Sequence, residues 1–141
     1  MKLMQKLIGA VVLISLCMVL PALATDPVDA GGWYDRGALL TVYGNEKGAV
    51  RCFQKAVELE PMSSPAYFQM GVSYGELGDY VAAITAIGKA IELNPDEGLY
   101  YYGRGRVYLQ AGQQSEAMGE FARAADLGNA DATAYLKRLG K

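Results

Sequence analysis

The stretch YYYGRGRVY at residues 100–108 sets arginines between glycines and aromatic rings. Such a composition can stack on the bases of single-stranded nucleic acid. Binding of phosphates also needs clustered positive charge. The chain has 13 Lys and Arg against 15 Asp and Glu, a formal net charge of −2, and its basic residues are not clustered elsewhere. This balance argues against a nucleic-acid partner, so the stretch needs a structural explanation.

Other residue types that could do chemistry are sparse. The chain has no histidine, the commonest acid–base group and metal ligand. Carboxylates such as Glu58 and Glu60 fall where helix ends are expected, and solvated charges are typical there. Ser63 and Ser64 have no base within sequence reach and precede a proline, which indicates a role in helix capping. The sequence therefore predicts a non-enzyme with no cofactor, no metal and no small-molecule substrate.

The N-terminal 24 residues have the pattern of a secretory signal peptide. A positively charged start, an apolar run over residues 7–20 and the small residues Ala22 and Ala24 predict cleavage before Thr25. The alternative is an uncleaved anchor, because residues 7–24 are near the lower length limit for spanning a bilayer. Pro21 and the Ala-x-Ala pattern favour cleavage. The expected location is therefore the periplasm or the outside of the cell.

Cleavage would leave 117 residues with a net charge of −4 and one cysteine, Cys52. That length is enough for one domain with a modest core, and no intrachain disulfide could form in it. Cys52 is expected to act as a small apolar side chain; a reactive or intermolecular thiol is the alternative.

Similar residues recur at intervals of 34 positions, in the units 30–63, 64–97 and 98–131. Recurrence at a fixed period is the sequence signature of a repeat architecture. The residues in register are aromatic, glycine, alanine, bulky apolar or proline: Trp33, Gly37, Ala49, Phe53, Ala56, Pro61, Tyr67, Gly71, Tyr74, Ala83, Ala90, Pro95, Tyr101, Gly105, Tyr108, Ala117, Phe121 and Ala124.

This pattern, W-x2-L-G-x2-Y…A-x3-F…A…P, resembles the tetratricopeptide repeat. The resemblance implies an all-α fold, a right-handed superhelical stack of three antiparallel helix pairs. Some positions depart from the pattern. Arg36 and Arg104 stand where leucine is usual, Leu40 replaces a tyrosine, and Ile87 replaces an aromatic residue. These departures touch single contacts and leave the fold assignment unchanged.

The physical reading of the second unit agrees with helix, turn, helix. Gly78 follows the first helix, where a left-handed conformation costs glycine little, and Asp79 is placed to cap the next helix. Gly71 and Ala83 are small enough to let the two helices approach closely. A glycine inside a helix costs about 0.5–1 kcal/mol against alanine, so its recurrence needs such a packing cause.

The ends of the chain complete the predicted organisation. Residues 25–29 form a short N-terminal segment, and residues 132–141 are expected to form a capping helix, because a repeat stack needs a polar outer face at its end. The residues of this helix divide into an apolar stripe and a polar face: Ala132, Tyr135, Leu136 and Leu139, against Lys137, Arg138 and Lys141.

The resemblance also implies a concave groove that binds a protein or peptide. In this family the fifth repeat position faces the groove, and here it is aromatic in every unit. Two interpretations stay open, because aromatic residues at helical spacing can anchor a partner or pack in the core. The hypothetical groove residues, near which Leu99 also lies, are Tyr34, Ala38, Phe68, Gln69, Val72, Tyr102, Arg106 and Leu109.

The register also explains residues 100–108. Tyr101, Gly105 and Tyr108 take structural repeat positions, which leaves Tyr102 and Arg106 for the groove. Family members that bind chaperone tails carry lysine and asparagine at the fifth and ninth positions, and this chain does not. The sequence thus favours an exported, non-catalytic adaptor for another protein. The alternative is a structural scaffold that self-associates or is tethered to a membrane.

Overall fold

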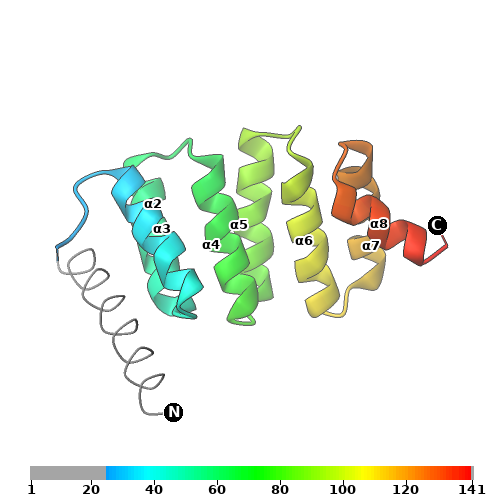
Figure 1. Cartoon of the computed structure of the whole chain (residues 1–141), viewed down its shortest axis with the longest axis horizontal. Coiled ribbons are helices and arrows are strands. Elements are labelled where there is room, and N and C mark those ends of the chain that lie inside the picture. Colours follow the sequence, from blue (N-terminus) through cyan, green and yellow to red (C-terminus); the bar gives the residue numbers. More distant parts are fainter. Residues whose placement is uncertain (1–24, 141) are drawn as a thin grey trace, which may run out of the picture.

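The computed structural model describes residues 25–140, so the predicted signal peptide and Lys141 lie outside the described residues. Within this range the chain forms α-helices and no strand, which confirms the all-α fold class (Figure 1). The helices are α2 (Ala30–Val42), α3 (Glu46–Leu59), α4 (Ser64–Glu76), α5 (Tyr80–Leu93), α6 (Gly98–Gln110), α7 (Gln114–Asp126) and α8 (Ala130–Arg138).

Glycine and a capping side chain end one helix and begin the next within each pair. Gly78 adopts φ +80°, a left-handed conformation that terminates α4. The carboxylate of Asp79 then accepts a hydrogen bond of 3.1 Å from the backbone N–H of Ala82, as expected for the first turn of α5. Asn45 does the same for α3. These local signals set the antiparallel helix pairs.

The helix start at Ser63 differs from the expectation of a serine cap. Ser63 occupies the capping position of α4, but its side chain makes no capping hydrogen bond. The hydroxyl of Ser64 instead lies 3.2 Å from the hydroxyl of Tyr100 on α6. Pro65 needs no hydrogen-bond acceptor in the first turn, since it has no backbone N–H. Ser64 therefore links α4 to α6 of the next helix pair.

Close approach of the paired helices explains the recurrent glycine. A Cβ atom on Gly71 would lie 2.5 Å from Cγ1 of Ile87 and 2.9 Å from the carbonyl oxygen of Ala83. A Cβ on Gly37 would lie 2.7 Å from the ring of Phe53. Atoms cannot approach so closely, and any larger residue would push α4 from α5 or α2 from α3. The predicted packing role of Gly71 is confirmed.

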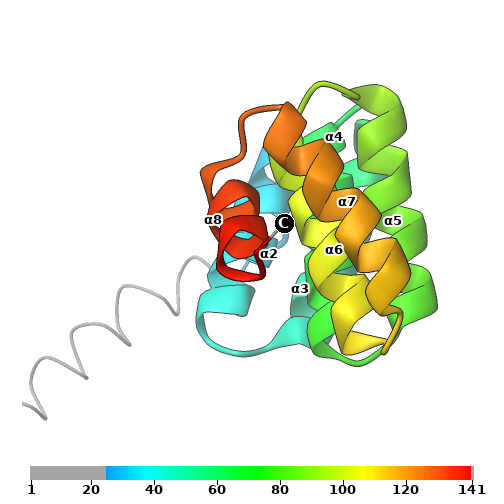
Figure 2. The same cartoon turned by 90° about the vertical axis from the view of Figure 1, so that its right-hand side faces the viewer.

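The helix pairs stack in chain order, and each second helix also covers the first helix of the next pair (Figure 1). For example, the side-chain amide of Gln54 on α3 donates a 2.9 Å hydrogen bond to the hydroxyl of Tyr74 on α4. Seen along the stack, α5 and α7 lie toward one side and α2 and α8 toward the other (Figure 2). The interiors of the pairs hold the fully buried side chains of Phe53, Ile87 and Phe121.

Helix α8 packs against α7 through residues that continue the 34-residue register. Tyr135 lies 34 positions after Tyr101, and its ring centroid is 4.7 Å from that of Phe121. Ala132 is fully buried. Leu139, expected in the apolar stripe, follows the last residue of the helix and is 46% exposed. The stripe therefore ends with Leu136.

Candidate functional site

The side chains of the hypothetical groove lie on α2, α4 and α6, and the structure divides its three aromatic residues. Phe68 is only 8% exposed, and its ring centroid lies 4.9 Å from that of Tyr100. Gly103 makes room for this ring, because a Cβ there would lie 2.5 Å from it. Phe68 therefore belongs to the core between α4 and α6.

Tyr34 and Tyr102 are half-buried instead. Each ring lies 5.6 Å, between centroids, from the phenylalanine of its own helix pair, Phe53 or Phe121. The neighbouring helix explains why Tyr34 does not insert as Phe68 does. Gln69 of α4 occupies the position that Gly103 holds in α6, and glutamine leaves no equivalent space. These two tyrosines remain available at the surface.

A small cavity of about 90 Å³ lies beside Tyr102, with Phe68 among its lining residues. Val72 and Leu99 supply apolar walls, and Leu99 is 45% exposed. Arg106 lies at the same cavity and is exposed, and no ion pair within the described residues involves it. The cavity has room for about one apolar side chain, beside a guanidinium that can bind a carboxylate.

A larger cavity of about 350 Å³ lies beside Tyr34, at the N-terminal ends of α2 and α4. Its lining includes the carboxylates of Asp35 and Glu60 together with Pro65. The Tyr34 cavity is thus acidic, whereas the Tyr102 cavity carries Arg106. The remaining groove residues are half-buried: Ala38, Gln69, Val72 and Leu109.

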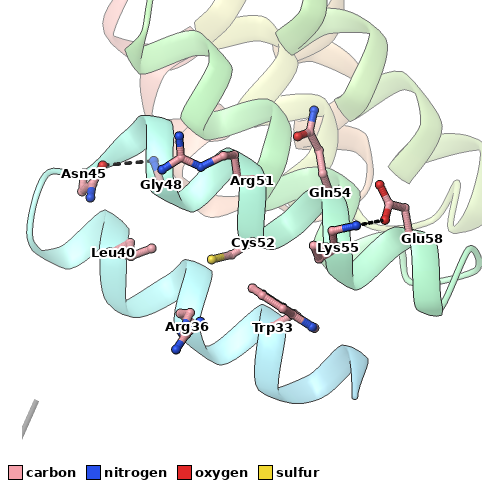
Figure 3. A pocket seen from close by; sticks show the side chains of 10 residues that line it. All are labelled: Trp33, Arg36, Leu40, Asn45, Gly48, Arg51, Cys52, Gln54, Lys55 and Glu58. Carbon is pink, nitrogen blue, oxygen red and sulfur yellow. Dashed lines mark hydrogen bonds and ion pairs between the residues drawn. The ribbon is translucent and has the colours of Figure 1, made fainter. Parts of the chain in front are cut away.

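A third cavity, of about 540 Å³, lies at the N-terminal end of the stack (Figure 3). We call it the end pocket. Trp33, Arg36 and Leu40 of α2 face it from one side, and Arg51 and Cys52 of α3 from the other. The other residues that line it are Asn45, Gly48, Gln54, Lys55 and Glu58.

Arg36 is the most constrained charged residue of the end pocket. Its guanidinium lies 2.8 Å from the carboxylate of Asp26 and donates a 2.5 Å hydrogen bond to the carbonyl oxygen of Thr25. It also lies over the Trp33 ring, 5.4 Å from the centroid. Arg36 thus fastens the N-terminal segment to α2. Sequence reasoning treated Arg36 only as a departure from leucine and missed this contact, although an arginine at an apolar position was a signal.

Cys52 is 5% exposed and forms no disulfide. Burial raises the pKa of its thiol, and the positive charges of Arg36 and Arg51 only partly oppose this effect. A thiol with a raised pKa is protonated at neutral pH and is a poor nucleophile. Cys52 therefore behaves in this structure as a small apolar side chain.

Residues 25–140 of the structure contain neither a cluster of metal-ligating side chains nor a helix able to span a membrane. Between Thr25 and Gly140, no group of three or more Cys, Asp or Glu side chains is placed to hold a metal ion. In the same range, every helix is too short or too polar to cross a bilayer. The structure offers two candidate binding sites. One is the end pocket, and the other is the face of α2, α4 and α6 that carries the hypothetical groove residues, which we call the groove face.

Comparison with known proteins agrees with this fold. Residues 68–132 match the family model of the tetratricopeptide repeat. No curated protein matches the sequence significantly. The chain also resembles solved structures of repeat proteins, so the fold is an all-α solenoid of the tetratricopeptide type.

Three of these structures illustrate the similarity. The first tetratricopeptide repeat domain of Spaghetti (RPAP3), bound to an HSP90 peptide, is 21% identical, with a TM-score of 0.73 over 82% of this chain and 94% of that chain. YrrB, described as having an unusual peptide-binding site, is 22% identical, with a TM-score of 0.75 over 82% of this chain and 60% of that one. MamA is 26% identical, with a TM-score of 0.67 over 74% and 57%. The chain thus spans less than two thirds of YrrB and of MamA.

Proposed function

We infer that this protein is an exported, non-catalytic adaptor that holds a segment of another protein against its groove face. Two of the similar repeat proteins are described as binding peptides, the Spaghetti domain with an HSP90 peptide and YrrB with an unusual peptide-binding site. The observation that carries the proposal is the cavity beside Tyr102, where Leu99 stays 45% exposed next to an available Arg106. Such a combination of an apolar socket and one charged group is typical of a peptide anchor.

The charges of the two groove cavities give the bound segment a direction. An apolar side chain of the partner enters the Tyr102 cavity, and a neighbouring carboxylate pairs with Arg106. Toward α2 the segment meets Asp35 and Glu60, so a basic residue fits there. Phe68 acts as the buried floor of the Tyr102 cavity, and the half-buried rings of Tyr34 and Tyr102 contact the bound segment.

The test is affinity capture from extracts of the native envelope, with the variants Tyr102→Ala and Arg106→Gln compared with the unchanged protein. Tyr43→Ala serves as a matched control, because Tyr43 is 58% exposed and lies outside the groove residues. Loss of the same captured protein with both groove variants, but not with the control, would support the proposal. Arg106 is exposed, so its variant should melt like the unchanged protein. Undiminished capture by both variants contradicts the groove assignment.

Export is supported by the residue pattern of the first 24 residues. Mass spectrometry of the protein recovered from its native compartment tests it. A mature N-terminus at Thr25 is the expected result, and an intact N-terminus at Met1 would favour the tethered form.

A scaffold role in a larger assembly is the second candidate function. The observation that favours it is the end pocket, a cavity of about 540 Å³ at the N-terminal end of the described helices. In a repeat stack each unit contacts its neighbours, so such an end can contact another protein.

A further inference from the structure

The Tyr102 cavity carries a negative charge as well as the positive charge of Arg106. Glu76, the last residue of α4, lines this cavity together with Arg106 of α6. Both side chains are exposed, and no ion pair within the described residues involves either of them. The cavity therefore offers two opposite charges to a ligand, one from each of the helices that form its walls.

The rest of the lining is mostly apolar. Phe68 and Val107 are buried, and Val72 and Leu99 supply further apolar surface. The volume of about 90 Å³ accommodates one aliphatic side chain. The chemistry of the cavity is thus that of a single apolar socket beside one cation and one anion.

The two charges occur only in the step from α4 to α6. Glu76 lies one period after Val42 and holds the same repeat position. Arg106 lies one period after Val72 and likewise holds its position. Because the step from α2 to α4 forms with valine at both places, the packing of the repeats does not require either charge.

Helix α4 gains no stability from Glu76. The macrodipole places partial negative charge at the C-terminal end of a helix, so a carboxylate is unfavourable there. Glu76 stands at this end of α4, and the last turn of the helix carries no basic residue to compensate. A role in stability does not explain this residue, whereas a role in binding does.

We propose that the Tyr102 cavity selects a segment of another protein in which one aliphatic residue lies between an acidic and a basic residue. This inference rests on the proposed groove function and adds Glu76 as a specificity-determining residue. The aliphatic side chain enters the cavity, the acidic residue pairs with Arg106, and the basic residue pairs with Glu76. Helix α4 lies between α2 and α6 in the stack, so beyond Glu76 the segment continues toward the acidic Tyr34 cavity (Figure 1).

The spacing of the helices sets the distance between the two charged residues of the segment. Helices α4 and α6 are in contact, because the Phe68 ring packs against Gly103. Packed helices lie about 8–10 Å apart, and an extended chain advances about 3.3–3.6 Å per residue. Charged residues about three positions apart therefore reach Arg106 and Glu76, with the aliphatic residue between them.

A second copy of this chain lacks such a segment at its surface. Each exposed large apolar residue between positions 25 and 140 has charges of one sign, or none, within three positions on either side. Leu59, for example, lies between Glu58 and Glu60, and Leu139 follows Lys137 and Arg138. The occupant is therefore a different protein.

The test is an NMR titration of the isotope-labelled protein with hexapeptides blocked at both ends. One peptide has the order Gly-Asp-Leu-Gly-Lys-Gly and another the reverse order, because the two charges do not fix the direction of the chain. Further peptides replace the aspartate by asparagine, the lysine by glutamine, or the leucine by serine. The backbone N–H of Gly103 and the Nε–H of Arg106 report occupancy of the cavity.

We expect saturable shifts of both signals with the charged leucine peptide in its preferred direction. Replacing either charged residue should weaken binding about three- to fivefold, as expected for an exposed charge pair. Serine in place of leucine should abolish saturation, because the apolar socket then stays empty.

Three protein variants assign the charges. In Arg106→Gln the replacement of aspartate should lose its effect while that of lysine keeps it, and in Glu76→Gln the reverse should hold. The double variant Glu76→Val, Arg106→Val copies Val42 and Val72 and should bind charged and neutral peptides with equal affinity. Circular dichroism verifies the fold, and Glu76→Gln should melt no lower than the unchanged protein.

An unchanged preference for lysine in Glu76→Gln would overturn the inference, as would equal affinity of the unchanged protein for charged and neutral peptides. So would the absence of any shift at Gly103 and Arg106. Shifts that grow with protein concentration alone would assign the cavity to a second copy and also overturn it. In each case capture from envelope extracts with Tyr102→Ala and Arg106→Gln decides separately whether the proposed groove function holds.

Discussion

The guanidinium of Arg104 lies 2.8 Å from the carboxylate of Glu120, which is sixteen residues later in the chain and on the second helix of the same pair. Both side chains are largely buried, at 21% and 18% exposed. Arg104 also lies over the Tyr101 ring, 5.8 Å from its centroid. This arrangement explains how an arginine can stand where the repeat usually has leucine. Its long side chain packs as an apolar residue would, and its charge is neutralised within the pair.

Replacing Glu120 by Gln should therefore destabilise the protein. The substitution removes the negative charge opposite a partly buried guanidinium, and we expect a loss of about 1–3 kcal/mol in the free energy of unfolding. Urea denaturation followed by circular dichroism measures it. Glu58→Gln is the matched control, because the Lys55–Glu58 pair is exposed and should contribute less than about 1 kcal/mol. Equal losses for both variants would contradict the structural role of the Arg104–Glu120 pair.

Phe68→Ala should cost about 3–5 kcal/mol, because it leaves a cavity between α4 and α6. This is the opposite of what a pure partner-binding residue would show. Tyr43→Ala, which also removes an aromatic ring but from the exposed end of α2, should change stability by less than about 0.5 kcal/mol. Thermal melting of the two variants compares them. Similar melting temperatures would mean that Phe68 is a surface residue after all.

Gly103→Ala and Gly119→Ala should have effects of opposite sign, although both place a methyl group inside a helix. At Gly103 the new Cβ would meet the Phe68 ring at 2.5 Å, and the resulting displacement should cost about 1–3 kcal/mol. At Gly119 nothing lies within 4 Å of the new Cβ, and alanine should stabilise α7 by about 0.5–1 kcal/mol. Denaturant midpoints of the two variants decide the matter. Stabilisation by Gly103→Ala would rule out the insertion of Phe68 described above.

The thiol of Cys52 should make stability fall at alkaline pH. Burial raises its pKa in the folded protein, so in the unfolded chain the thiol ionises at lower pH. The stabilising contribution is present below the ordinary thiol pKa of about 8.5 and is lost as the pH rises through the higher folded value. Unfolding free energies measured from neutral pH upward should therefore decline.

The control for this effect is Cys52→Ala, since alanine occupies the same repeat position in the second pair, at Ala86. In this variant the free energy of unfolding should fall less at alkaline pH, because the contribution of the thiol is absent. Alkylation provides an independent measurement, and Cys52 of the folded protein should react more slowly than the same residue in urea. Rapid alkylation in the native state would contradict its burial.

The 34-residue register was enough to predict the all-α fold class, the helix turn at Gly78 and the packing role of Gly71. These features depend on interactions close in sequence or repeated in every unit, and a single chain displays them directly. The register did not predict which aromatic residue of the fifth position is buried and which are half-buried. That depends on the next helix, where Gly103 makes room for the Phe68 ring and the equivalent repeat position after Tyr34 is Gln69.

The sequence alone also determined that catalysis lacks its usual residue types and that the chain has the composition of a repeat protein rather than of a nucleic-acid binder. Only the tertiary structure decided that Arg104 pairs with Glu120 of its own helix pair whereas Arg36 pairs with Asp26 of the N-terminal segment. The two arginines hold the same repeat position, and the register makes them equivalent. Their difference comes from the second helix of each pair, because α7 places Glu120 beside Arg104 whereas α3 carries Cys52 at the equivalent repeat position.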